Sequence, residues 1–125
     1  MRRFEINKPA HITSRALINI FREKDDCYRF IFQFFAANLG RRGTNVFVKD
    51  AVKAGEALLR GENISSKFVV QEHPPLVNLI DFSLVANHYH FYLLPNREDA
   101  VSVLMGKLNN GFAKFFNITH GRKDA

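Results

Sequence analysis

The amino-acid sequence predicts an α+β domain in which helices pack on an antiparallel β-sheet. Three observations predict this class. Apolar residues recur at helical spacing over 27–35 and again over 101–116, and a run with strand composition over 76–94 lies between them. The resulting order of elements, β-α-α-β-β-α, is typical of helices packed against an antiparallel sheet. At 125 residues, the chain is expected to form one domain over 1–125.

The first half of the chain is predicted to contain a strand and two helices. Residues 10–20 alternate loosely between polar and apolar side chains, which indicates a strand. Asp25 and Asp26 follow, where negative charge favours the start of a helix that ends at Gly40. We expect a basic turn at 41–43 and a second helix over 49–60.

The second half is predicted to contain a hairpin and a last helix. Residues 61–75 are polar and indicate a connector with a short extended piece. The run over 76–94 exceeds one strand, so we expect strands 76–86 and 88–94 around a turn at Ala86-Asn87. Asn96 is a candidate N-cap for a helix that runs to about Asn117. A three-stranded sheet leaves an edge uncovered, which favours a homodimer.

Composition narrows the classes of partner and compartment. There are 18 basic and 12 acidic residues, a formal charge of +6, which suits a polyanionic partner such as nucleic acid. Cys27 is the single cysteine, which excludes an internal disulfide and a zinc knuckle. We identify no signal peptide and no run of about 20 apolar residues, so no membrane contact and a cytoplasmic location are expected.

His88 and His90 are the candidate metal ligands. They lie two residues apart on a predicted strand, so both side chains leave from the same face, whereas Tyr89 and Phe91 point the other way. Two imidazoles held on a strand can bind one divalent ion, which would polarise a phosphate. On the spacing alone, two partly exposed strand histidines that bind nothing are the favoured interpretation.

Three short motifs in order resemble transposases of the HUH, single-tyrosine class, most closely the branch called REP-associated tyrosine transposases. Residues 87–90, Asn-His-Tyr-His, match that family's histidine motif, with Ala86 in place of its usual proline. The other matching residues come from the opening strand and helix and from the last helix: Thr13, Ser14, Arg15, Phe21, Arg22, Asp26, Met105, Lys107, Lys114, Phe115, Phe116 and Asn117. Residues 40–75 match least.

The resemblance implies a ferredoxin- or RRM-like HUH fold that binds DNA hairpins and cuts and rejoins single-stranded DNA nearby. In that family a tyrosine attacks the phosphate and stays joined to it, while Mg²⁺ or Mn²⁺ is held by the residues corresponding to His88 and His90. The family's Tyr-Ile-x-x-Asn helix and the strand before it have no counterpart in the sequence. We therefore expect an HUH domain that is incomplete at its C-terminus.

None of the three tyrosines is expected to act as that nucleophile. Tyr89 should face away from the histidines, and Tyr28 is expected to pack on the first helix. Tyr92 shares the histidines' face but lies on the same strand, which is a poor place for in-line attack. The resemblance thus implies an endonuclease family, but no catalytic residue is identified in this chain.

Seven basic residues are candidates for DNA phosphate contacts: Arg15, Arg41, Arg42, Lys107, Lys114, Arg122 and Lys123. Among the other histidines, His11 and His73 are expected to be structural or solvent-facing, and His120 belongs to the basic C-terminal residues. Three hypotheses remain open: a transposase domain that lacks its catalytic helix, a hairpin-binding module without chemistry, and a basic α+β domain whose histidines bind nothing.

Overall fold

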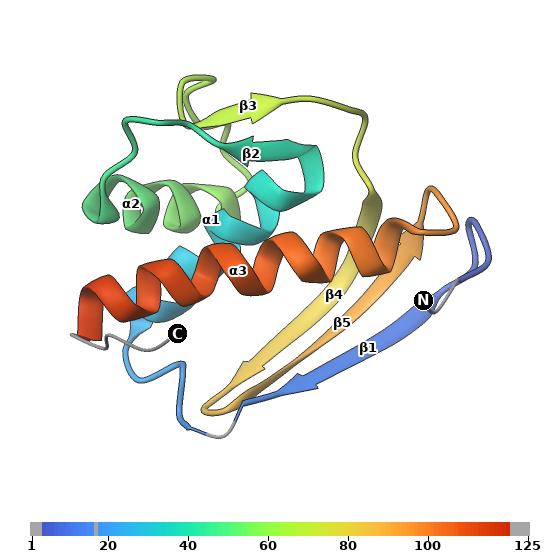
Figure 1. Cartoon of the computed structure of the whole chain (residues 1–125), viewed down its shortest axis with the longest axis horizontal. Helices are drawn as coiled ribbons and strands as arrows, with labels where there is room; N and C mark the ends of the chain where they lie inside the picture. The colour runs from blue at the N-terminus through green and yellow to red at the C-terminus, as the bar shows by residue number, and fades with distance from the viewer. Residues whose placement is uncertain (1–3, 17, 121–125) are drawn as a thin grey trace.

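A three-stranded antiparallel sheet with the strand order β1–β5–β4 forms the base of the fold (Figure 1). The computed structural model describes residues 4–16 and 18–120. The elements in chain order are β1 (Ala10–Arg15), α1 (Lys24–Leu39), β2 (Gly40–Arg42), α2 (Val48–Leu59), β3 (Val69–Gln71), β4 (Val77–Val85), β5 (His88–Pro95) and α3 (Ala100–His120). Strands β2 and β3 form a separate antiparallel pair. The predicted α+β class is confirmed.

Helices α1 and α3 cover one face of the three-stranded sheet. Phe30 and Phe34 of α1 meet the ring of Phe91 on β5, with centroids 6.0 and 4.9 Å away. From α3, Leu104 and Leu108 are fully buried in the same cluster. Burial of these large side chains against the sheet is the main stabilising contribution to the fold.

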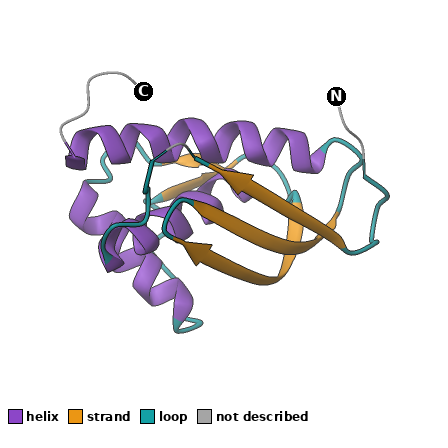
Figure 2. Cartoon of the chain, turned by 90° about the horizontal axis from the view of Figure 1, so that it is seen from below, coloured by secondary structure: helices purple, strands orange, loops and turns teal. Residues whose placement is uncertain are grey.

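The opposite face of the same sheet is open. The side chains of β1 alternate between half-buried and exposed, and those of β5 alternate between buried and partly or fully exposed. Seen from below in Figure 2, no helix crosses in front of the three strands. This side of the sheet therefore presents side chains to solvent, while the other side forms the core.

A second apolar cluster joins α1 to α2 and to the β2–β3 pair. Phe32 and Ala36 of α1 pack there with Ala51 and Ala54 of α2. At Gly55 the two helices approach so closely that an added Cβ atom would overlap the backbone carbonyl of Tyr28. A residue without a side chain is therefore required at this crossing.

Three boundaries differ from the predictions. Strand β1 ends at Arg15, because the chain then turns across the β4–β5 hairpin, where the Ile20 amide donates to the Ala86 carbonyl at 2.8 Å. The predicted basic turn at 41–43 is wrong in part, since Arg41 and Arg42 form strand β2. Asn96 is not the N-cap: α3 begins at Ala100, and the Asn96 amide donates to the Pro75 carbonyl at 2.9 Å.

Asp26 anchors the start of α1 and the end of the described part of α3. Its buried carboxylate accepts hydrogen bonds from His120 Nε2 at 2.9 Å and Arg29 Nη2 at 2.5 Å. The backbone amides of Arg22 and Glu23 donate to its other oxygen at 2.9 and 3.0 Å. Burial alone would raise the pKa of Asp26, but these four hydrogen bonds outweigh it and hold the pKa below its usual value.

No helix in residues 4–16 and 18–120 has both the length and the apolar composition needed to cross a membrane.

Replacing Gly55 by alanine is expected to destabilise the protein. The added methyl group overlaps the α1 backbone, and overpacking of this kind costs about 1–3 kcal/mol. Gly106 on α3 is the matched control, because a Cβ atom there meets nothing and helix propensity favours alanine by up to about 1 kcal/mol. Urea denaturation should show a lower unfolding free energy for Gly55→Ala and an equal or higher one for Gly106→Ala. A Gly55→Ala protein as stable as the wild type would contradict the close helix crossing.

Replacing Asp26 by asparagine is expected to remove part of the acid sensitivity of the fold. Since the pKa of Asp26 is lower in the folded state than in the unfolded chain, its stabilising contribution is present above the unfolded pKa of about 4. That contribution disappears as the pH falls through the lowered folded pKa. Asp26→Asn also leaves Arg29 without its carboxylate, which costs about 3 kcal/mol at neutral pH.

The measurement is the unfolding free energy of wild type and variant between pH 6 and pH 2. The difference between them should be largest at neutral pH and shrink on acidification. Asp25→Asn is the matched control, because Asp25 lies in the same helical turn but is exposed. A difference that stays constant with pH would show that the Asp26 carboxylate is not the titrating group.

Candidate metal centre and nucleic-acid interface

The open side of the three-stranded sheet carries a group of polar and aromatic side chains that we call the histidine face. Strand alternation and pairing place on it His11, Thr13 and Arg15 from β1, His88, His90 and Tyr92 from β5, and Asp81, Ser83 and Val85 from β4. In the β1–β5 register Thr13 lies opposite His90. Because β5 is the central strand, its histidines have a neighbouring strand on each side.

His90 has its closest polar contacts with β1. Its Nδ1 atom lies 3.1 Å from His11 Nε2 and 3.2 Å from Thr13 Oγ1. Thr13 Oγ1 is in turn 3.4 Å from His11 Nε2. Three potential ligand atoms from two strands therefore form a small triangle on the solvent side of the sheet.

Ring stacking fixes the orientation of His11. Its imidazole lies almost parallel to the Tyr92 ring, with centroids 4.5 Å apart and planes inclined by 6°. The His90 ring lies 5.3 Å away, centroid to centroid, and meets the His11 ring through their nitrogen atoms. An exposed histidine would ordinarily sample several rotamers, and the stack reduces that freedom.

His88 shares the histidine face with His90 but is oriented differently. The two ring centroids are 5.2 Å apart and the planes are nearly perpendicular. The His88 Nδ1 atom lies 3.0 Å from Asn87 Oδ1 and can donate a hydrogen bond to it. In that arrangement the other ring nitrogen, Nε2, can accept a hydrogen bond or bind a metal. The strand alternation that was predicted for 88–91 is present, since Tyr89 and Phe91 are buried in the core. The role of the two histidines as metal ligands stays a prediction.

On the histidine face, an imidazole of β1 and an imidazole of β5 meet through their nitrogen atoms, His11 Nε2 and His90 Nδ1. Within residues 4–16 and 18–120, no group of three or more histidine, cysteine, aspartate or glutamate side chains is placed to hold a metal. Two imidazoles and a hydroxyl nevertheless converge at His11, Thr13 and His90. Such a donor set, completed by water or phosphate oxygens, is chemically suited to a divalent transition ion.

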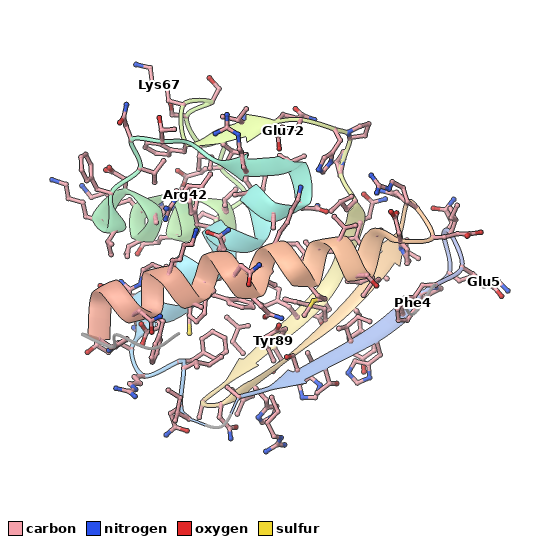
Figure 3. All side chains as sticks on the ribbon, in the orientation of Figure 1. Phe4, Glu5, Arg42, Lys67, Glu72 and Tyr89 are labelled. Atoms are coloured by element: carbon pink, nitrogen blue, oxygen red, sulfur yellow. The ribbon has the colours of Figure 1, made fainter. Side chains whose placement is uncertain are left out.

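A second surface, which we call the basic cleft, lies between α3 and β2 above α1. Its cavity volume is about 390 Å³. It is lined by Gln33, Ala37, Gly40, Arg41, Arg42, Glu72, Lys107, Asn110, Gly111 and Lys114. Four of the seven predicted DNA-contact residues, two from β2 and two from α3, thus line one hollow. In Figure 3, Arg42 and Glu72 lie on one side of α3 and Tyr89 lies on the other.

The cationic side chains of the basic cleft differ in how tightly they are held. The Lys107 ammonium donates to the Gly40 carbonyl at 3.2 Å and lies 3.2 Å from His73 Nε2, so it ties α3 to β2. Arg41 is 3.5 Å from the Glu72 carboxylate, an exposed pair of small energetic value. Lys114 is exposed at the rim of the cleft. Lys107 is therefore partly structural, whereas Arg41 and Lys114 are accessible to a ligand.

The remaining predicted residues are dispersed. Arg15 lies on the histidine face, opposite His88 in the β1–β5 register. Arg122 and Lys123 lie outside the described residues. His73 borders the basic cleft, and His120 contacts the buried Asp26, a structural role that its place among the basic C-terminal residues did not indicate.

His11 is the residue of this site that sequence reasoning missed. It was expected to be structural or solvent-facing, because nothing local in 10–15 distinguishes it. Its significance comes from the β1–β5 register, which brings it beside a histidine that is 79 positions away. The His-x-Thr spacing, which matches the alternation of His88 and His90, is the one signal that could have suggested a shared face.

Comparison with protein-family models, with curated proteins and with solved structures gives no match.

Proposed function

We propose that this chain is a DNA-binding domain of the HUH type, which recognises a DNA hairpin and holds the adjacent single strand and a divalent ion on its histidine face. The observation that carries the proposal is the position of His88 and His90. Both lie on the central strand, on the one sheet face that no described helix covers. An open, rigid sheet face gives a phosphate direct access to an ion bound there.

The basic cleft supports a nucleic-acid ligand independently of the histidines. Arg41, Arg42 and Lys114 approach one cavity from two elements, which is a suitable arrangement for successive phosphates. The cavity is too small for a duplex, so it would take a segment of sugar–phosphate backbone. The formal charge of +6 favours the same class of ligand.

The three tyrosines support binding over cleavage by this chain alone. Tyr89 is buried, 3% exposed, and its hydroxyl donates to Asn109 at 2.9 Å. Tyr28 lies half-buried on α1, on the helical side of the sheet. Tyr92 is 47% exposed, but its ring lies flat against His11 of the neighbouring strand β1. Tyr92 itself lies on β5, the strand that carries His88 and His90. Strand cleavage, the activity that the sequence resemblance implies, would then need a tyrosine other than these three.

Hairpin binding is tested by fluorescence anisotropy with a labelled DNA hairpin and an unstructured strand of equal composition. We expect tighter binding to the hairpin and an affinity that falls steeply with salt concentration. Arg41→Ala combined with Lys114→Ala should weaken binding and reduce the slope of log affinity against log salt by about 2, because each residue contributes about one phosphate contact.

Lys49→Ala combined with Lys53→Ala is the matched control. These lysines are exposed on α2 and do not line the basic cleft, yet the change in net charge is identical. An equal loss of affinity in both double variants would show that net charge, and not the basic cleft, determines DNA binding. Equal, weak binding of hairpin and unstructured strand would overturn the proposed recognition and favour a basic domain without a specific DNA ligand.

Cleavage is tested on denaturing gels after incubation of the chain with Mn²⁺ and labelled hairpin DNA that carries a single-stranded flank. We expect no covalent protein–DNA band. A band that is absent in Tyr92→Phe would instead show that Tyr92 Oη forms a bond to phosphorus as the P–O3′ bond breaks, with the tyrosine proton passing to the departing 3′ oxygen. In that case the chain is a complete nuclease and the binding-only proposal is wrong.

A further inference from the structure

We infer that His11 and Thr13 of β1, together with His90 of β5, form a divalent-metal site that this chain assembles across two neighbouring strands. The inference rests on the proposed function, in which the histidine face binds a divalent ion, and it assigns ligands that the His88/His90 motif does not contain. The three contributing atoms are His11 Nε2, Thr13 Oγ1 and His90 Nδ1.

The distances between these atoms match the edges of a metal coordination polyhedron. With metal–ligand bonds of about 2.1 Å, two ligands lie about 3.0 Å apart in an octahedron and about 3.4 Å apart in a tetrahedron. The three observed separations are 3.1, 3.2 and 3.4 Å. One ion placed on the solvent side of this triangle would therefore lie within bonding distance of all three atoms once the His11 and His90 rings turn toward it and give up their mutual hydrogen bond, which needs side-chain rotation but no movement of the strands.

The surroundings hold His11 in the orientation that such a site needs. Its ring is stacked on Tyr92 and hydrogen-bonded to His90, and the β1–β5 pairing sets Thr13 directly opposite His90. Ligands on two hydrogen-bonded strands lose little further freedom when an ion binds, which favours binding. The His88 ring, 5.2 Å from His90, stands beside the triangle and can approach the ion or a ligand on it.

The ligand types indicate which ion is bound and what completes its shell. Imidazole nitrogen suits transition ions, whereas Mg²⁺ prefers oxygen ligands and retains several waters. We therefore expect Mn²⁺ to bind more tightly than Mg²⁺. Two imidazoles and a hydroxyl are neutral ligands, so the ion keeps its full positive charge and attracts an anion. A phosphate oxygen on the exposed side is the ligand that the proposed function supplies.

The experiment is a titration of the full chain with Mn²⁺ alone, in which electron paramagnetic resonance measures the remaining free ion. His11→Phe keeps a ring that can stack on Tyr92 but removes the ligand nitrogen, and Thr13→Val removes the hydroxyl at nearly constant size. We expect His11→Phe and His90→Ala to weaken Mn²⁺ binding at least about tenfold. The effect of Thr13→Val should be smaller, because a hydroxyl is a weaker ligand. Mg²⁺ should displace Mn²⁺ only at large excess.

His73→Ala is the control for loss of a histidine elsewhere, since His73 borders the basic cleft. Hairpin affinity is measured for every variant without metal and should stay at the wild-type value for His11→Phe. Wild-type Mn²⁺ affinity in His11→Phe, with weakened binding in His88→Ala and His90→Ala, would overturn the cross-strand site and leave the proposed metal-binding face intact. If no histidine variant changes Mn²⁺ binding, the metal part of the proposed function fails as well, whereas the hairpin measurement decides its DNA part separately.

Discussion

The two-residue alternation of β5 is the constraint on which the rest of the structure depends. This strand pairs with both β1 and β4, so the direction of its side chains fixes which face of the whole sheet is core. Tyr89, Phe91 and Leu93 are buried under α1 and α3, and the residues between them are thereby directed to the open side. A shift of one residue in register would bury the histidines and expose the aromatic rings, at a large cost in free energy.

Local patterns were sufficient to predict most elements of this fold. These patterns depend only on residues that are close in sequence. They are the helical spacing in 27–35, the apolar stripe of the last helix and the break at Ala86-Asn87. Strand β2 was not identified and β3 was expected only as a short extended piece somewhere in 61–75, because three residues carry too little periodicity and the pairing of the two strands joins positions about 30 residues apart. The start of α3 was misplaced, since Asn96 is held by contacts with the strand region instead of capping the helix.

The candidate site was predictable only in the part that lies on a single strand. The alternation of His88 with Tyr89 and His90 indicates a shared face, and the structure has that face. The contribution of β1 depends on strand register, which the sequence pattern of 10–15 does not specify. The basic cleft likewise depends on the position of α3 beside β2, which puts Lys114 on the same cavity as Arg41 and Arg42. Residue type alone was enough to select these cationic residues as candidates, but it could not predict that they line one cavity.

The position of α1 between two layers has a consequence for how the domain loses its structure. Phe30 and Phe34 are packed on its sheet side, while Phe32 and Ala36 are packed on its α2 side, so the helix belongs to both apolar clusters. Neither cluster can open while the other stays intact without exposing phenylalanine rings to water. The sheet and the α2 region should therefore melt as one cooperative unit, and partial opening should be confined to segments that do not contact α1. Four of the 13 phenylalanines in the sequence lie on this one helix, at positions 30, 32, 34 and 35.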